Sequence, residues 1–185
     1  DKGQVLSGGS AFEISTPYLT AELFDIKFAQ SADVMYITHP SHATRKLSRT
    51  GHTSWTLATV DFTNGPYLDT NISTTTITAS SKTVGTGRTF TASASLFVST
   101  DVGRLIRFRD GHAKVTGFTS ATVVTVEITK DTGSASASTD WSLGAFSDTT
   151  GHASCVTFFE QRLVFAATLN NPQTIYFSKS GDYEN

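Results

Sequence analysis

The feature that most constrains the fold of this chain is a strand–turn–strand pattern that occurs twice, near its two ends. The first copy starts with a strand at residues 33–37 and returns to the string Ser48-Arg49-Thr50-Gly51. The second starts with a strand at residues 162–166 and returns to Ser178-Lys179-Ser180-Gly181. Each copy turns at a loop that holds a proline. A recurring unit of this kind predicts blades of one repeated antiparallel sheet architecture.

The composition favours strands over helices throughout the chain. Only 16% of the residues are charged and 38% are hydrophobic, and there are 14 glycines and 13 phenylalanines. Threonine and aromatic residues suit a half-buried pleated surface, whereas glycine and serine suit turns. We therefore predict an all-β protein with little helix. One helical turn is expected at residues 20–25, with Thr20 as its N-cap and Leu23 facing the core.

The middle of the chain differs from both ends. The N-terminal part predicts a meander with strands at 33–39, 43–49 and 54–62. From about residue 66 the sequence is rich in threonine and serine, and apolar residues alternate with polar ones at Phe90, Ala92, Ala94 and Leu96. Such alternation is typical of one face of a strand. Further short strands are predicted at residues 104–109, 114–118, 122–129 and 141–143. Five or six short strands in this segment predict a small β-barrel or sandwich.

These segments define the expected domains. Residues 1–65 are predicted to form an N-terminal blade-like β-meander, and residues 66–148 an inserted Thr/Ser-rich small β-barrel. Residues 149–185 are expected to form a second blade-like hairpin that continues the first domain. Because the chain begins with Asp1 and stops within a motif at Asn185, we expect it to be a fragment of a longer protein.

Charge and cysteine content exclude several classes of function. The formal net charge is −2, so no global basic field is available to hold nucleic acid. The single cysteine, Cys155, rules out an internal disulfide framework, and we expect it to be a small buried hydrophobic residue. No run approaches the roughly 20 apolar residues of a membrane helix, so no membrane span is expected.

The histidines and carboxylates do not predict an active site. His39 and His42 flank a Pro-Ser turn, while His52, His112 and His152 each lie beside a glycine. No carboxylate or cysteine partner lies at a recognisable spacing, so we interpret them as solvent-exposed turn residues and expect no metal. The string 151–155 lacks the second glycine of a nucleophile elbow. We therefore predict no catalytic residue, no cofactor and no enzyme activity.

Three residues remain candidates for surface recognition. Arg107 and Arg109 are expected to share one strand face, where they could meet phosphate, an acidic glycan or a neighbouring subunit. A solvated strand face is the alternative interpretation. Trp141, like Trp55, could stack on a sugar, but each lies in an alternating strand, where packing in the core is the commoner use of tryptophan.

Two stretches of the chain resemble the tail proteins of bacteriophages and prophages. The first is Phe28-Ala29-Gln30-Ser31-Ala32-Asp33-Val34-Met35-Tyr36-Ile37-Thr38-His39-Pro40, followed by Arg45-Lys46-Leu47-Ser48-Arg49. The second contains Glu160-Gln161-Arg162-Leu163 and Ser178-Lys179-Ser180-Gly181-Asp182. Within this group the chain is most similar to the tail tubular, or nozzle, proteins of short-tailed phages. The resemblance implies propeller-like sheets, assembly as a ring around the conduit for the genome, and no catalytic residues.

The resulting expectation is a structural virion protein of a phage or prophage tail. Its partners would be copies of itself in a ring and neighbouring tail proteins, with DNA passing through a channel without sequence-specific binding. It would be assembled in the bacterial cytoplasm and located in the virion tail. The inserted segment departs from the nozzle pattern and resembles accessory β-modules of phage structural proteins. The alternatives are a module that binds a host glycan or receptor and a tail-associated polysaccharide depolymerase.

Overall fold

The protein is nearly all-β in a computed structural model that describes residues 5–185. Strands account for 48% of the residues. Two short 3₁₀ helices, η1 (Thr20–Glu22) and η2 (Ser99–Asp101), interrupt the strands, and a two-stranded ribbon of β1 (Leu6–Ser7) and β2 (Ser10–Ala11) precedes them. The all-β prediction is confirmed. None of the helices in this described part is long and apolar enough to cross a membrane.

The chain divides into two compact units. Unit 1 consists of the chain up to Asp61 together with His152–Glu184, and unit 2 is the continuous segment Phe62–Gly151, to which Asn185 is added. Unit 2 thus lies in sequence between the two parts of unit 1. The predicted domain from residue 1 begins with four residues, 1–4, that lie outside the described part of the chain.

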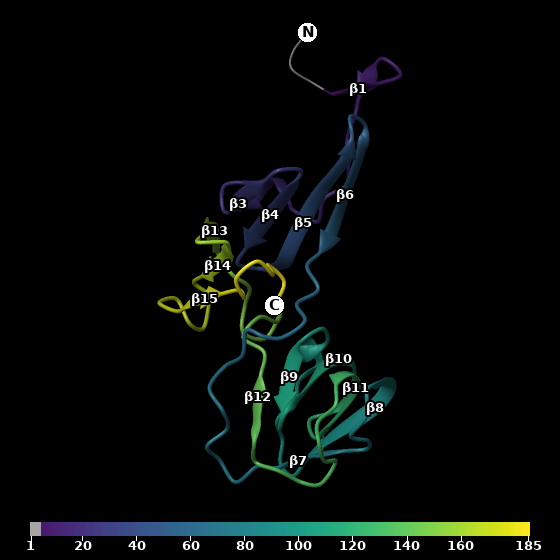
Figure 1. Ribbon diagram of the computed structural model, residues 1–185, viewed down its shortest axis with the longest axis vertical. Coiled ribbons are helices and arrows are strands. Elements are labelled where there is room, and N and C mark those ends of the chain that lie inside the picture. The colour runs from purple at the N-terminus through teal and green to yellow at the C-terminus, as the bar shows by residue number, and fades with distance from the viewer. Residues whose placement is uncertain (1–4) are drawn as a thin grey trace. The chain divides into compact units, whose positions relative to one another are not determined.

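Unit 1 contains a four-stranded antiparallel meander (Figure 1). Its strands, in spatial and sequence order, are β3 (Lys27–Ser31), β4 (Val34–His39), β5 (His42–Gly51) and β6 (Ser54–Thr59). The last three agree with the strands predicted at 33–39, 43–49 and 54–62. Two-residue connections between successive strands set the register, because a short turn leaves no freedom to slide one strand past the next.

The second sheet of unit 1 has three antiparallel strands: β13 (Cys155–Phe159), β14 (Arg162–Ala166) and β15 (Ile175–Phe177). Glu160 and Gln161 connect the first two, with φ angles of 45° and 61°. Positive φ at both central residues is the geometry that matches the right-handed twist of a hairpin. Both copies of the sequence pattern, at 33–49 and 162–177, are therefore antiparallel hairpins.

Aromatic side chains pack the two sheets of unit 1 together. The ring of Tyr36, only 4% exposed, lies 6.1 Å from that of Phe158 and 6.4 Å from that of Tyr183, centroid to centroid. Its hydroxyl donates to Glu184 (3.1 Å), which also forms an ion pair with Lys46. Burial is the main cause that raises the pKa of Tyr36, and the Glu184 carboxylate raises it further.

Unit 2 is a six-stranded antiparallel sheet that curls into a half-barrel. Its spatial order is β12 (Trp141–Leu143), β9 (Leu105–Phe108), β10 (Gly111–Ser120), β11 (Val123–Lys130), β8 (Gly85–Ala92) and β7 (Ile77–Ala79). The concave side holds a continuous hydrophobic core from alternate strand positions, which includes these fully buried residues: Ile77, Phe90, Ile106, Phe108, Ala113, Val124, Val126 and Ile128. This core, more extensive than that of unit 1, follows directly from the period of two in the sequence.

The alternation predicted from Phe90 to Leu96 ends earlier than expected. Phe90 and Ala92 are buried, but β8 stops at Ala92 and Ala94 is exposed. The chain then turns, and Phe97 rather than Leu96 is almost fully buried. The amides of both Leu96 and Phe97 donate to the carbonyl of Ala121, which fixes this turn.

Two local predictions in unit 1 are wrong. The helical turn is N-capped by Leu19 instead of Thr20, and Leu23 is 53% exposed because the 3₁₀ helix ends at Glu22. Cys155 is exposed and not buried. It lies on the face of β13 that points away from the core, together with Thr157 and Phe159.

A buried ion pair fixes one end of unit 2. The guanidinium of Arg104, 4% exposed, donates to Asp101 Oδ1 and to the carbonyl of Gly144, both at 2.8 Å. Asp101 also accepts from Thr149 Oγ1 and from the amide of Val98. Both carboxylate oxygens of Asp101 and two of the guanidinium nitrogens of Arg104 thus have hydrogen-bond partners.

We predict that Arg104→Leu lowers the free energy of unfolding of unit 2 by about 3–5 kcal/mol, because it leaves the Asp101 carboxylate buried without its counter-charge. Urea denaturation followed by tryptophan fluorescence measures this change. Lys130→Leu, at an exposed strand end of the same unit, is the control and should change the stability by less than about 0.5 kcal/mol. Equal effects of the two substitutions would contradict the prediction.

Candidate functional site

Trp141 is part of the core of unit 2. Its side chain is 7% exposed, and the indole Nε1–H donates to the carbonyl of Thr75 at 2.9 Å. Of the two interpretations drawn from the sequence, packing in the core describes this residue. Its ring is not presented at the surface for a sugar to stack on.

Arg107 and Arg109 hold the chain that leads into β12. Arg107 donates to Asp140 Oδ1 (2.8 Å), to side-chain hydroxyls of Thr70 and Ser142, and to the carbonyl of Arg109. Arg109 lies beyond the end of β9 with φ of 54°, so it does not continue the strand face of Arg107. Its guanidinium donates to two backbone carbonyls, those at positions 136 and 137. Both arginines therefore have internal partners, and a role in anion recognition stays a prediction.

The positive charge of Arg107 also influences the pKa values of Tyr67 and His112, which form a pair. The hydroxyl of Tyr67 and Nδ1 of His112 are 3.2 Å apart, and the two rings are stacked. Burial raises the pKa of Tyr67 to about 12, so the hydroxyl keeps its proton at neutral pH. Burial is also the main cause that lowers the pKa of His112, and the positive charges of Lys130 and Arg107 add to it.

The sequence predicts that all the histidines in turns are exposed to solvent. The structure shows that this prediction is wrong for two of them. His39 is 3% exposed and His152 is 7% exposed, whereas His52 is exposed. The backbone amide of His152 donates to the carbonyl of Pro40, so the C-terminal part of unit 1 contacts this turn. The rings of Tyr18 and His42 pack against His39, with centroids 6.0 and 4.9 Å from that of its ring.

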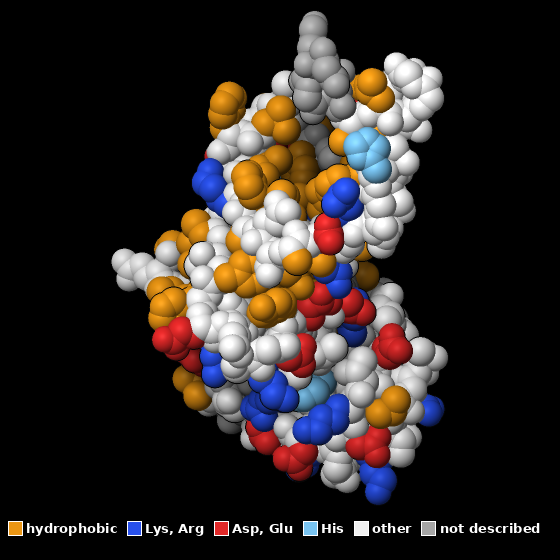
Figure 2. Space-filling model, turned by 45° about the horizontal axis from the view of Figure 1, so that its top comes forward, with side chains coloured by type: hydrophobic (Ala, Val, Ile, Leu, Met, Phe, Trp, Pro, Cys, Tyr) orange, Lys and Arg blue, Asp and Glu red, His pale blue; other side chains and the backbone are white. Residues whose placement is uncertain are grey.

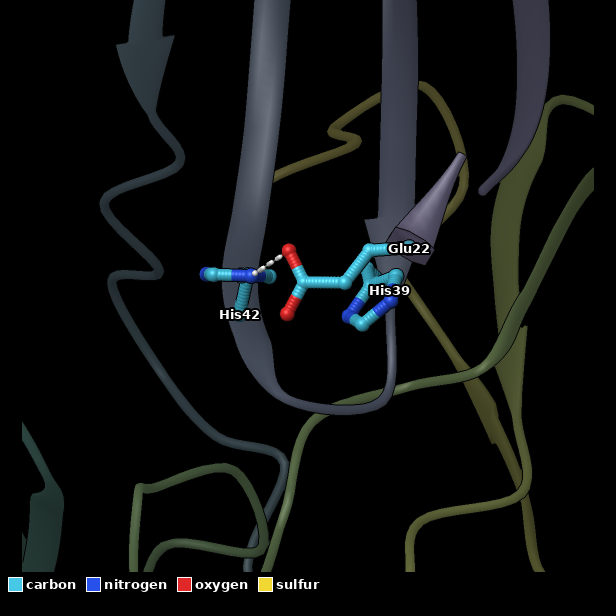
Figure 3. A group of neighbouring side chains, drawn as sticks. All are labelled: Glu22, His39 and His42. Carbon is cyan, nitrogen blue, oxygen red and sulfur yellow. Dashed lines mark hydrogen bonds and ion pairs between the residues drawn. The ribbon is translucent and has the colours of Figure 1, made fainter. Parts of the chain in front are cut away.

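His39, His42 and Glu22 form a compact polar cluster (Figure 3). His39 and His42 are paired across the β4–β5 hairpin, with ring centroids 4.9 Å apart. Glu22 comes from η1, and its Oε2 accepts from Nε2 of His42 at 2.9 Å. One ring nitrogen of each histidine and a carboxylate oxygen of Glu22 lie within 4.8 Å of one another. We call these three residues the Glu–His cluster.

The backbone fixes two members of the Glu–His cluster. The amide of Leu19 donates to Oε2 of Glu22 at 2.8 Å, which orients the carboxylate toward the hairpin. This hydrogen bond is the main cause that lowers the pKa of Glu22, and the bond with His42 is the second. The amide of Ser41 donates to Nδ1 of His39 at 3.1 Å, so this nitrogen carries a lone pair and not a proton.

Glu22 is the member that sequence reasoning missed. It lies 17 residues before His39, and nothing in its spacing marks it as a partner. The one available signal was the helical turn predicted at 20–25, whose acidic residue could orient toward a neighbouring strand. The pair of histidines on a two-residue hairpin was visible, but the sequence could not show that the chain before β3 returns to this turn.

A second candidate region is the face of the β13–β15 sheet that points away from Tyr36. We call it the outer face, and its exposed apolar residues are Cys155, Phe159, Ile175 and Phe177. The register places Arg162, Val164 and Ala166 of β14 beside them, and Val164 is only 8% exposed. Phe159, Ile175 and Phe177 are 56–58% exposed. Figure 2 shows hydrophobic side chains at the surface of unit 1. An antiparallel sheet that faces water usually carries polar residues on that side, so this face is suited to a partner.

A shallow depression of about 270 Å³ lies on the meander of unit 1. Its lining consists of Gln30, Asp33, Met35, Leu47, Arg49 and Trp55. The Nε1–H of Trp55 donates to the carbonyl of His52, which fixes the ring. Arg49 lies over this ring, 5.8 Å from its centroid, and pairs with Asp33 at 3.2 Å. The depression thus combines an aromatic ring with donors and acceptors.

Comparison with known families finds no family model that matches this chain, and no curated protein matches it significantly.

We predict that unit 2 loses stability as the pH falls below about 6.5, the ordinary pKa of histidine in an unfolded chain. The lowered pKa of His112 means that the unfolded state binds a proton more readily, so acid favours unfolding until the folded pKa is reached. In His112→Gln the difference in unfolding free energy between pH 7.5 and pH 5 should be smaller than in the unchanged protein. His52→Gln, at an exposed turn, should leave that difference unaltered.

Proposed function

We propose that this chain is a structural protein of a bacteriophage or prophage tail, a subunit of an oligomeric ring of the nozzle or tail-tube type. The proposal combines the family resemblance of the two hairpin stretches with one structural observation. That observation is the outer face of the β13–β15 sheet, where apolar side chains project into solvent from its two edge strands, β13 and β15.

The arrangement of strands in unit 1 is compatible with the proposed role. The antiparallel meander β3–β6 has the strand number and order of a propeller blade, and β13–β15 is a shorter sheet of the same kind. In a ring, each subunit presents one surface to the next copy in a head-to-tail contact that closes. We infer that the outer face is the apolar part of such a contact and that a second copy of the chain covers it.

The energetics favour an assembly over an exposed sheet. Burying a large apolar side chain that was exposed contributes about 1.5–3 kcal/mol. Nine of the exposed large hydrophobic residues belong to unit 1: Leu6, Leu19, Leu23, Phe24, Phe28, Phe159, Leu169, Ile175 and Phe177. The three that lie on the outer face would together supply a substantial part of the free energy of a subunit contact.

We predict that the chain self-associates at micromolar concentration and that Phe177→Ser raises the dissociation constant at least about tenfold, in line with the loss of one buried aromatic side chain. Sedimentation velocity over a range of concentrations measures this constant. Ile72→Ser is the matched control, because Ile72 is fully exposed but lies in unit 2.

Two results would contradict the assignment to a ring. One is an unchanged protein that stays monomeric at every micromolar concentration tested. The other is an equal effect of the two substitutions, which would show that association depends on general hydrophobicity and not on the outer face. Circular dichroism of each variant checks that the sheets are intact.

The depression at Trp55 favours a second function, recognition of a host glycan or receptor. Tryptophan rings stack on the apolar faces of sugars, and Gln30, Asp33 and Arg49 could bind hydroxyl groups beside the ring. Because Arg49 covers part of the ring, a sugar would displace this guanidinium from it. This location differs from the one expected at Trp141.

If the second function holds, Trp55→Ala abolishes binding on a glycan array or adsorption to host cells. Phe118→Ala, which removes a partly exposed aromatic ring from unit 2, should leave binding intact. Binding that survives Trp55→Ala, or an unchanged protein that binds no glycan, would exclude this site as the receptor contact.

A further inference from the structure

We propose that the Glu–His cluster is a binding site for a divalent transition-metal ion, with Zn²⁺ as the best match. The three ligands would be one ring nitrogen from each of His39 and His42 and a carboxylate oxygen of Glu22. This inference goes beyond the structural role proposed above and does not depend on it.

The type of ligand selects the class of metal. Imidazole nitrogens suit zinc, copper, iron and nickel, whereas calcium and magnesium prefer a shell made of oxygens. Two histidines and one glutamate are a known three-ligand set for zinc, in which a water molecule completes the tetrahedron. Zn–N and Zn–O distances near 2.1 Å require ligand atoms about 3.4 Å apart. The ligand atoms here lie within 4.8 Å of one another, so modest side-chain rotations close the site.

The positions of the ligands are set largely by the backbone. His39 and His42 are register partners on the tight β4–β5 hairpin, which keeps their rings adjacent. The Leu19 amide holds the carboxylate of Glu22, as an outer-shell partner holds a metal ligand. Since the backbone already brings the three side chains together, only side-chain rotations are needed to close the site around an ion.

The protonation states are also compatible with binding. The amide of Ser41 keeps Nδ1 of His39 unprotonated, and Ser41 is exposed, so its amide can turn to water if an ion takes that lone pair. His42 currently donates a proton to Glu22. A metal ion would occupy the position of this proton, which would move to the other ring nitrogen or to solvent.

An independent observation also indicates an occupant. The Nε2 atom of His39, in a side chain that is only 3% exposed, is buried and has no hydrogen-bond partner. The ring of Tyr18 packs against both histidines, at 6.0 and 5.3 Å between centroids. Buried polar atoms without partners are costly, and an ion with its bound water is a common reason for them.

The test uses the 185-residue chain after treatment with a chelator. Isothermal titration with Zn²⁺ is expected to show one site per chain, and Co²⁺ should give the visible absorption of a cobalt ion bound by nitrogen and oxygen ligands in a tetrahedron. Zn²⁺ should also raise the melting temperature, because it joins η1 to the β4–β5 hairpin.

Two substitutions remove a ligand without removing the surrounding contacts. Glu22→Gln keeps an oxygen that accepts from Leu19, and His42→Gln changes a half-buried residue on the hairpin. Each is expected to weaken zinc binding by at least about 100-fold, since the loss of an outer-shell partner alone costs 10–100-fold. His52→Gln, an exposed histidine of the same unit, should bind zinc as the unchanged chain does.

The proposal is overturned if the unchanged chain binds no zinc at a one-to-one ratio. It is equally overturned if Glu22→Gln and His42→Gln, both folded by circular dichroism, bind as tightly as His52→Gln. In the latter case the zinc would be held adventitiously by other surface histidines.

Discussion

The contact of Tyr36 with Phe158 and Tyr183 is the interaction on which unit 1 depends. A three- or four-stranded sheet is stable only when one of its faces is packed against another apolar surface. The two sheets of unit 1 supply that surface to each other through these rings and through the buried Leu163 and Phe165. The ion pair of Lys46 with Glu184 then closes the edge of this small core.

Because the two sheets of unit 1 pack only one face each against the other, the surfaces of the two units differ. Unit 2 curls around a continuous core, although Ile72 and four other large hydrophobic residues of this unit are exposed. Unit 1 uses one face of each sheet for its own core and leaves apolar residues on the other side of β13–β15. The features that suit contact with other molecules, namely the outer face, the Trp55 depression and the Glu–His cluster, therefore all lie in unit 1.

Much of the fold could be predicted from the sequence, because alternation and turn residues are local signals. The strands of the meander, the two hairpins and the short strands at β9–β12 follow from such patterns. A period of two shows which residues share a face, but it does not show which face is buried. Cys155 was misplaced for this reason, since β13 carries apolar residues on both sides.

The candidate site was less accessible to sequence reasoning. The packing of His39 depends on Tyr18, which is distant in sequence, and the partnership of Glu22 depends on where the chain before β3 runs. Trp141 and Arg107 were predicted as candidates for surface recognition, yet their hydrogen-bond partners lie in loops whose paths no local pattern reveals. Sites assembled from distant segments require coordinates for this reason.

The insertion of unit 2 between the two parts of unit 1 also determines the order of events on the ribosome. The half-barrel is one uninterrupted stretch, so it can complete its core as soon as it has left the exit tunnel. Until the segment beyond His152 has been translated, the face of the N-terminal meander that carries Tyr36 lacks the sheet it packs against. During this interval a nascent meander could capture the C-terminal hairpin of a neighbouring chain, which would yield an interlocked dimer by exchange of identical elements.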